Sequence, residues 1–269
     1  MASAQARTTP ATTNAPETAV AVRDLWAGYD GAPALERLTF ELPAGELVGL
    51  AGPNGSGKTT LLKTLLGLNK PWRGEVQVFG QPIDAVRRRV GYAPQSELVD
   101  WDFPVTVADV VMMGRYARIG LLRRPGAVDR EAVAAALDMV DMETLAQRQI
   151  GELSGGQQRR MLIARALAQE ADLLLLDEPL VGLDATSQHD LLTLFERLRA
   201  QGKTLLVATH DLSCVAACFT LALLLNRRLV AFGPPAEIFT PEILSEAYAE
   251  HLLLLPTEGG VFVGHHGHG

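Results

Sequence analysis

A chain of 269 residues is long enough to bury one large core or two modest ones, and 48% hydrophobic with 20% charged residues is typical of a globular protein. The net charge of −7 excludes a global basic field that would recruit nucleic acid, so we expect no nucleic-acid partner. Two cysteines, Cys214 and Cys218, exclude a disulfide framework and are expected to be small buried residues in a reducing compartment.

Residues 1–18 are rich in Ala, Thr and Pro and contain no hydrophobic run, which predicts a disordered tail and no signal peptide. The nearest candidate for a membrane span, Thr204–Leu225, is interrupted by His210 and Asp211. It is better interpreted as a strand, a loop, a helix and the start of another strand. We therefore expect one soluble domain over residues 19–250, followed by a C-terminal tail over residues 251–269.

The domain opens with short apolar runs separated by turn residues, at Val20–Leu25, Leu38–Leu42 and Val76–Phe79. They predict an antiparallel β-layer. Farther along, strand-like Leu173–Asp177 and Leu205–Ala208 alternate with helix-like Asp190–Ala200. This alternation favours an α/β fold whose parallel sheet is covered by helices.

Between the first strands lies a segment that completes the pattern G-x-x-x-x-G-K-[ST], namely Gly52-Pro53-Asn54-Gly55-Ser56-Gly57-Lys58-Thr59. Leu47–Ala51 before it predicts a buried strand, and Thr60–Leu68 after it predicts a helix. The glycines allow backbone N–H groups to point inward toward a polyphosphate, above the positive end of the helix dipole. Lys58 would then reach the β- and γ-phosphates, and the Thr59 hydroxyl would ligate Mg²⁺. The alternative is an accidental match in a Gly-rich turn, and the flanking strand and helix argue against it.

The middle of the chain, about residues 97–168, is predicted to be a helical subdomain inserted into the α/β core. Three segments carry apolar residues at helical spacing: Val105–Gly114, Asp129–Val140 and Gln157–Ala168. Asp129 is the expected N-cap of the second helix.

Asp177 and Glu178 follow a run of four leucines at the end of a predicted strand. The aspartate is expected to hold Mg²⁺ through water, and the glutamate to orient and polarise a water for in-line attack on the γ-phosphate. A solvated loop is the alternative for such an acidic pair. The leucines before it and Pro179 after it argue against that alternative.

A second Gly-rich segment, Leu153-Ser154-Gly155-Gly156-Gln157, precedes the helix of the inserted subdomain. Serine and glycines at a helix N-terminus predict a second anion site. Two anion sites on separate subdomains suggest a dimer in which each nucleotide is held by both chains. For this segment alone, a plain helix-capping turn is the alternative.

These motifs, in this order and together with Gln95 and His210, resemble the ATP-binding subunits of ABC transporters. The resemblance covers Val20–Tyr248. It implies a P-loop NTPase core that hydrolyses ATP with Mg²⁺.

The resemblance also implies roles for single residues. Tyr29 is similar to the aromatic residue that stacks on adenine, with Trp26 a weaker candidate. Gln95 resembles the glutamine that joins the Mg²⁺ shell, and His210 resembles the histidine that contacts the γ-phosphate. Asp184 resembles the acidic residue of a loop along the dimer interface.

The family resemblance further implies partners. Two copies are expected to close head-to-tail around two ATP molecules, with Ser154–Gln157 of one copy capping the γ-phosphate held by the other. Such a homodimer needs an integral-membrane permease, which places the chain at the cytoplasmic face of the membrane. An importer would also act with an extracytoplasmic binding protein.

Val99–Val107 and Asp109–Arg115 resemble the manganese, zinc and iron branch of bacterial importers. Trp101 and Phe103, beside two acidic residues, are predicted to anchor the permease. The alternative is that these two aromatic residues simply pack the core of the subdomain.

Three histidines near the C-terminus, His265, His266 and His268, predict a weak site for a metal ion. The alternative is a flexible end without a role, and the family resemblance does not reach this tail.

Other functions remain open at this point. The cargo could be an iron chelate or another substrate, or the transporter could be an exporter. A soluble ABC ATPase of cofactor assembly is a further alternative, against which the segment around Trp101 argues. A GTPase switch is disfavoured because the sequence has Leu153–Gln157 and no separate guanine-reading motif.

Overall fold

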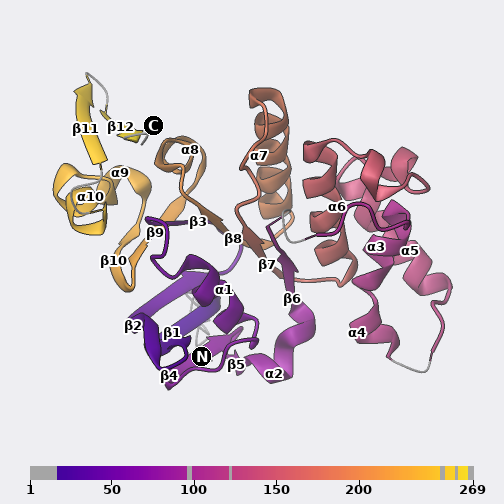
Figure 1. The fold of residues 1–269 in the computed structure, drawn as a ribbon. Coiled ribbons are helices and arrows are strands. Elements are labelled where there is room, and N and C mark those ends of the chain that lie inside the picture. Colours follow the sequence, from indigo (N-terminus) through magenta and orange to yellow (C-terminus); the bar gives the residue numbers. More distant parts are fainter. Residues whose placement is uncertain (1–16, 96–98, 121–122, 249–251, 258–259, 266–269) are drawn as a thin grey trace, which may run out of the picture.

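A six-stranded sheet forms the centre of the molecule (Figure 1). The structure is a computed structural model that describes residues 17–95, 99–120, 123–248, 252–257 and 260–265. In spatial order the strands are β10 (Arg228–Gly233), β9 (Leu221–Asn226), β3 (Leu47–Ala51), β8 (Thr204–Thr209), β7 (Leu173–Asp177) and β6 (Val90–Ala93). All neighbours pair parallel except β10, which pairs antiparallel with β9.

A second, antiparallel sheet covers part of one face. Its order is β2 (Ala32–Pro43), β1 (Thr18–Tyr29), β4 (Arg73–Val78) and β5 (Gln81–Pro82). The first two strands are longer than their apolar runs predict, because register shifts let the chain continue through polar positions. One such shift lies between Val22 and Leu25, where Asp24 has a positive φ of 45°.

The helices that pack on the central sheet are α1 (Lys58–Leu65), α6 (Gly155–Ala168), α7 (Ala185–Ala200) and α8 (Leu212–Cys218). Strand β7 shows how both faces are filled. Leu173 and Leu175 join the core shared with α1 and the antiparallel sheet, whereas Leu174 and Leu176 join the core shared with α6, α7 and α8. Successive side chains of a strand point to opposite faces, so a continuous leucine run suits a strand that is buried on both sides.

Capping residues move several helix boundaries away from the expected positions. The Asp184 side chain accepts a hydrogen bond from the Ser187 amide, so α7 begins at Ala185 and not at Asp190. Ser154 and Gln157 form a reciprocal capping box, so α6 begins at Gly155.

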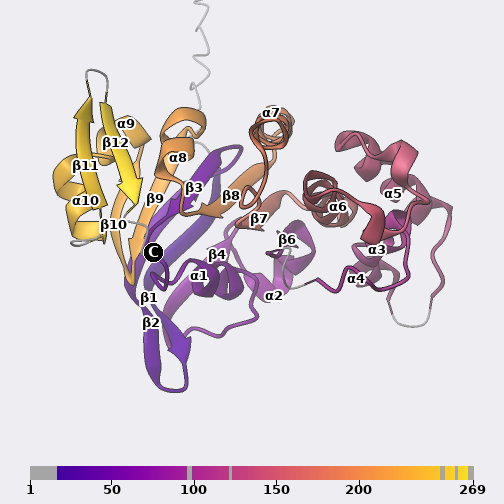
Figure 2. The same ribbon diagram turned by 45° about the horizontal axis from the view of Figure 1, so that its top comes forward.

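The inserted subdomain contains α3 (Val107–Met113), α4 (Tyr116–Ile119) and α5 (Ala127–Met139). The prediction that Asp129 is an N-cap is wrong. The N-cap is Gly126, three residues earlier, and the Asp129 carboxylate reaches back to accept from the Gly126 amide at 2.9 Å. Figures 1 and 2 both show these three helices beyond α6, on the side away from the strands.

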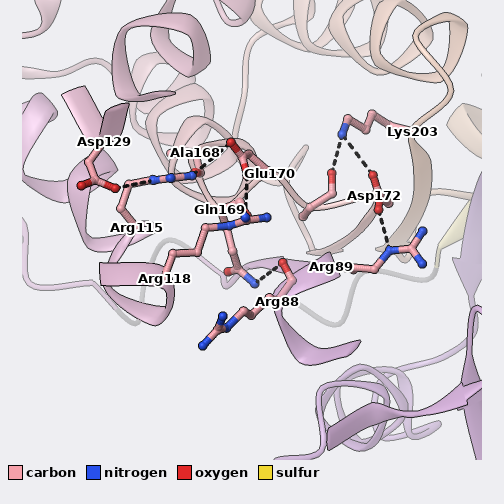
Figure 3. A network of polar contacts seen from close by, with 11 residues as sticks. Arg88, Arg89, Arg115, Arg118, Asp129, Ala168, Gln169, Glu170, Asp172 and Lys203 are labelled. Carbon is pink, nitrogen blue, oxygen red and sulfur yellow. Dashed lines mark hydrogen bonds and ion pairs between the residues drawn. The ribbon is translucent and has the colours of Figure 1, made fainter. Parts of the chain in front are cut away.

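A network of polar contacts fixes the subdomain to the core (Figure 3). Buried Arg115 pairs with Asp129 of α5 at 3.1 Å and donates to the carbonyl of Ala168, the last residue of α6, at 2.9 Å. The next residue, Gln169, donates to the carbonyl of Arg88 beside β6 at 3.1 Å. Charged groups in good geometry make strong hydrogen bonds, so the end of α6 is held to both parts of the molecule.

The chain continues through α9 (Pro235–Ile238) and α10 (Pro241–Tyr248), then into a hairpin of β11 (Leu252–Thr257) and β12 (Gly260–His265). This hairpin falls within the expected C-terminal tail and was not predicted. His266 and His268 lie outside the described residues, as do residues 1–16 of the expected N-terminal tail. None of the described helices combines the length and apolar character needed to cross a bilayer.

The observed layers confirm the predicted fold class, with its parallel sheet, antiparallel layer and helical insertion. The remaining short elements are α2 (Ile83–Val86) and three 3₁₀ turns at Arg87–Arg89, Glu143–Leu145 and Ile150–Glu152.

Candidate nucleotide-binding site

A cavity of about 670 Å³ opens where β3 ends and α1 begins. The residues that line it are Ala34, Pro53, Asn54, Gly55, Ser56, Gly57, Lys58, Thr59, Thr60, Gln95, Asp177, Glu178, Val181, His210 and Tyr248. The structure therefore gathers the predicted phosphate loop, the acidic pair, Gln95 and His210 around one space. The carboxyl ends of β3, β7 and β8 meet at this edge of the sheet, which is where parallel α/β folds place their ligands.

The path of the phosphate loop requires glycine at two positions. A Cβ on Gly52 would lie 2.1 Å from the Leu225 carbonyl oxygen, and a Cβ on Gly57 would lie 2.7 Å from the carbonyl oxygen of Ala34. Gly57 also has a φ of 102°. The loop is thus pressed against backbone on both sides, which fixes its curvature around the cavity.

The Lys58 side chain is buried, with only 7% exposed, and its ammonium donates to the carbonyls of Gly52 at 2.8 Å and Pro53 at 3.1 Å. Burial lowers the pKa of Lys58, while the nearby carboxylates of Glu178 and Asp177 raise it. The loop carbonyls therefore hold a cation at the wall of the cavity, close to two carboxylates.

Asp177 is 4% exposed and lies at the end of β7. Its two carboxylate oxygens accept from the Thr59 hydroxyl at 3.4 Å and from the Tyr92 hydroxyl at 3.3 Å. Burial raises the pKa of Asp177, although these two hydrogen bonds and Lys58 lower it. Together with the amide of Gln95 on the same cavity, this is a set of oxygen donors of the kind that Mg²⁺ prefers.

Glu178 directly follows Asp177 in the chain and has a positive φ of 51°, which is uncommon for a residue with a side chain. Its amide donates to the Ala208 carbonyl at 3.0 Å, so the turn is tied to β8. The carboxylate Oε2 lies 3.1 Å from Nδ1 of His210. Such a backbone conformation persists where the surroundings hold it in place, and here it aims the carboxylate into the cavity beside the imidazole.

The two aromatic candidates for base stacking differ in their surroundings. Tyr29 ends β1 and is 48% exposed, although it is not among the residues that line the cavity. Trp26 is partly buried, with its indole N–H enclosed and without a hydrogen-bond partner among the described residues. An exposed ring has a face available for a base, so the structure leaves Tyr29 as the better placed of the two.

The second predicted anion site does not join this cavity within one chain. Ser154 and Gly155 are exposed at the start of α6, and neither lines the space around the phosphate loop. Asp184 is also exposed, and hydrogen bonds from the Ser187 amide and hydroxyl hold the pKa of its carboxyl below the ordinary range. Both segments are thus presented at the surface of a single chain.

The two residues predicted to anchor the permease differ in burial. Trp101 is half-buried and packs against the core of the helical subdomain, whereas Phe103 is 55% exposed. A separate cavity of about 780 Å³ lies between that subdomain and the core, lined by Leu66, Leu68 and Met113 among others.

The metal site predicted for the histidine tail stays a prediction, because only His265 of its three histidines lies within the described residues. Across the part of the chain that the structure describes, no group of three or more His, Cys, Asp or Glu side chains is arranged to hold a metal ion. Cys214 is buried, which raises the pKa of its thiol to about 12, and Cys218 is half-buried one turn away.

Four residues of the site were not predicted. Tyr92 reaches Asp177 from the neighbouring strand β6, and Ala34, Val181 and Tyr248 line the cavity. No sequence motif marks Tyr248, which enters from α10, far along the chain from the phosphate loop.

Comparisons with known proteins agree with this geometry. Residues 35–181 match the protein family described as ABC transporter. The chain is 46% identical to the manganese transport system ATP-binding protein MntB of Halalkalibacterium halodurans, over 91% of this chain and 97% of that protein. It is 47% identical to the zinc transport system ATP-binding protein TroB of Treponema pallidum, over 86% of each.

Solved structures show the same architecture. A chain from a metal-chelate type ABC transporter in an inward-facing conformation is 32% identical, with a TM-score of 0.78, and the match covers 92% of this chain and 96% of that one. CbiO1 from Clostridium perfringens, part of the ABC transporter complex cbiONQ, is 27% identical with a TM-score of 0.74 over 86% of this chain and 94% of that one. The chain therefore belongs to the family of ABC transporter ATP-binding subunits, which are ATPases.

Proposed function

We propose that this chain is the ATPase of a bacterial importer for a metal ion such as manganese or zinc. The observation that carries the proposal is the near-complete coverage of relatives named for manganese and zinc transport, at 46% and 47% identity. The cavity geometry supports ATP hydrolysis by this chain, and the names of the relatives support a metal ion as the transported substrate.

ATP would enter the cavity with its phosphates on the loop and its base against Tyr29. Lys58 now bonds to two loop carbonyls, and a polyphosphate offers its ammonium a charged acceptor instead. The N-terminus of α1 adds a positive dipole end beneath the same phosphates.

Thr59, Gln95 and Asp177 fit an Mg²⁺ ion, since all three are oxygen donors on one wall and the Asp177 carboxylate is buried. Mg²⁺ bound there would neutralise charge on the phosphate oxygens. Tyr92 holds the second oxygen of Asp177, which fixes the orientation of the carboxylate.

Glu178 would orient the attacking water, and His210 would contact the γ-phosphate. In the present structure the two side chains pair with each other at 3.1 Å. A γ-phosphate would compete for His210 and leave the Glu178 carboxylate available to a water in line with it.

The cavity is complete only when a second copy closes over it. Ser154, Gly155 and Asp184 are exposed in one chain and carry groups suited to an anion and to an interface. We infer a head-to-tail homodimer in which the N-terminus of α6 from one copy caps the γ-phosphate on the other.

Metal-ion movement requires a membrane permease, which would dock at the cytoplasmic face on the groove between core and helical subdomain. Apolar Leu68 and Met113 are exposed there, and Phe103 presents a further exposed aromatic ring on that subdomain. An extracytoplasmic binding protein would deliver the ion to the permease.

Uptake of ⁵⁴Mn²⁺, ⁶⁵Zn²⁺ and ⁵⁵Fe in cells that lack this chain tests the proposal. Cells complemented with the wild-type chain are expected to regain uptake of manganese or zinc, whereas cells complemented with Glu178→Gln are not. Uptake of all three ions at equal rates in deleted and complemented cells would contradict metal import. A defect in iron alone would point to the iron-chelate alternative.

A further inference from the structure

Arginine is concentrated in one short stretch of this acidic chain. Residues 115–130 contain five arginines and one acidic residue, Asp129, whereas the whole chain has a net charge of −7. The fold brings four of these arginines together with another from the turn before β6, and all of them line one cavity of about 500 Å³. We call this set the arginine surface: Arg88, Arg115, Arg118, Arg123 and Arg124. Positive charge from two separate segments is therefore gathered at one place.

Two arginines of this surface are neutralised by carboxylates of the protein. The Arg115 side chain is 5% exposed and pairs with Asp129 at 3.1 Å and with Glu170 at 3.4 Å. Arg118 pairs with Glu170 at 2.8 Å and donates to the carbonyl of Gln169 at 3.1 Å. These contacts hold the wall of the cavity in place, and they engage the carboxylates that lie beside it.

The other three arginines, Arg88, Arg123 and Arg124, are exposed and form no ion pair within the part of the chain that the structure describes. In Figure 3 only the backbone carbonyl of Arg88 takes part in the network, as an acceptor from Gln169, and the guanidinium lies apart from it. A guanidinium stays charged at every physiological pH, and its fork of N–H donors matches phosphate and carboxylate oxygens. These side chains are therefore available to an anionic partner.

The arginine surface adjoins the groove on which we propose that the permease docks. Arg88 lines both cavities, and Met113 and Ala117 of the groove lie within two residues of Arg115 in the chain. A permease seated in the groove would bring the arginine surface close to the bilayer around it. The inference below rests on the proposed function in this one respect, because only a transporter subunit meets a membrane at that groove.

We propose that the arginine surface binds anionic phospholipid headgroups of the bilayer next to the permease. Arginine forms paired hydrogen bonds with phosphate oxygens, and the cytoplasmic leaflet is rich in anionic lipids. Val128 lies in the same cavity, is 68% exposed and offers an apolar contact at the level of the headgroups. An acidic segment of the permease suits the surface less well, because the cytoplasmic loops of membrane proteins carry an excess of Lys and Arg.

Flotation of the purified chain with vesicles tests this inference. We expect the wild type to float with vesicles of phosphatidylglycerol and phosphatidylcholine in equal parts, and not with phosphatidylcholine alone. The variant that combines Arg123→Gln with Arg124→Gln should lower the partition coefficient about 25-fold, at about fivefold for each arginine. Raising the salt concentration should release the wild type from the vesicles, because the attraction is electrostatic.

A matched control combines Arg37→Gln with Arg227→Gln, which makes the same change in net charge. Both arginines are exposed, and neither lines the cavity. This control should lower the partition coefficient by less than about twofold, since charges farther from the bilayer than a Debye length are screened. ATP hydrolysis in solution should stay within about twofold of the wild type for both double variants, which would show that they fold.

A wild type that does not float with anionic vesicles would overturn the inference. So would equal flotation of the wild type and the Arg123→Gln/Arg124→Gln variant, or an equal loss in the control. Binding to polyglutamate in place of vesicles, with loss in that variant, would assign the surface to an acidic protein segment and contradict the membrane as its partner. Flotation without restored metal uptake would refute the proposed function alone, and restored uptake without flotation would refute this inference alone.

Discussion

Two helices of this protein begin at glycine-rich turns, and the two turns are built in opposite ways. Helix α1 starts at Lys58 after a loop that lines a cavity, and in this loop Gly52 and Gly57 lie too close to backbone carbonyls of other strands to carry a side chain. Helix α6 starts at Gly155 on the surface, where Ser154 and Gln157 cap each other within one turn.

In the dimer that we propose, the difference separates the phosphate loop, which one chain builds by itself, from the α6 turn, which would act on a nucleotide held by the other chain. The amides at the start of α1 share their cavity with Lys58, Asp177 and Glu178. The first amides of α6 have no intrahelical acceptor, which makes them available to an anion that another copy carries. Changes at α1 should therefore abolish nucleotide binding, whereas changes at α6 should spare binding and prevent closure.

Lys58→Ala should have the largest effect. Removing the cation that faces the β- and γ-phosphates is expected to lower ATP hydrolysis about 10³-fold and to weaken ATP binding by a monomer. Lys63→Ala, one turn farther along α1, is the control because Lys63 does not line the cavity. Calorimetric titration with ATP and a phosphate-release assay measure both quantities. Unimpaired ATP binding by Lys58→Ala would contradict the assignment of the loop.

Gly52→Ala compared with Gly155→Ala tests how firmly each turn is fixed by its surroundings. The new Cβ at position 52 would lie 2.1 Å from the carbonyl oxygen of Leu225, and we expect a loss of about 3 kcal/mol in unfolding free energy. At position 155 the nearest atoms are 3.5 Å and 3.7 Å away, so stability should change by less than about 1 kcal/mol. Urea titrations of both variants measure the difference. Equal losses of unfolding free energy in the two variants would contradict the claim that only the phosphate loop is fixed by neighbouring backbone.

Ser154→Ala should have an effect of intermediate size, lowering stability and hydrolysis but leaving ATP binding by a monomer unchanged. Loss of the α6 cap is expected to lower stability by about 1 kcal/mol. Hydrolysis should fall about tenfold through loss of one group on the shared phosphate, while ATP binding by a monomer stays unchanged. Thr106→Ala, which removes the side chain that caps α3, controls for cap loss alone. A fall in monomer ATP affinity for Ser154→Ala would place its effect inside the cavity of its own chain.

Asp177→Asn should have the smallest effect on stability, and the effect should be favourable. Burial raises the pKa of Asp177, so the folded state without nucleotide holds this proton more tightly than the unfolded chain. The proton therefore stabilises the fold at low pH, and this contribution is lost as the pH rises through the folded pKa. Without nucleotide at pH 7.5, Asp177→Asn should melt about 2 °C above the wild type.

The gain in melting temperature of Asp177→Asn should shrink as the pH is lowered toward 5. Mg²⁺-dependent ATP hydrolysis by this variant should be lost at every pH. Asp172→Asn is a matched control. Asp172 pairs with Arg89 and Lys203, so its neutralisation should bring no gain in melting temperature. A gain for Asp172→Asn equal to that for Asp177→Asn would show that burial at the cavity is not the cause.

Patterns within a few residues predicted most of the cavity, because the phosphate loop and the acidic pair each follow a strand whose end fixes their position. Helix starts were predicted less well. Asp129 was expected to begin its helix and instead caps it from the third position, since carboxylates at both places bond to the same free amides. Tyr92 and Tyr248 escaped prediction for another reason. Their contacts depend on which strands and helices lie side by side, and no local pattern records that.

Dimerisation of the Glu178→Gln protein, followed by size-exclusion chromatography with light scattering, tests the central claim most directly. Without the carboxylate that we propose orients the attacking water, ATP should hold two copies together, giving twice the 28.9 kDa mass of one chain only when ATP is present. Ser154→Arg in the same background should remain a monomer that still binds ATP. A Glu178→Gln protein that binds ATP tightly and stays monomeric would contradict the shared site.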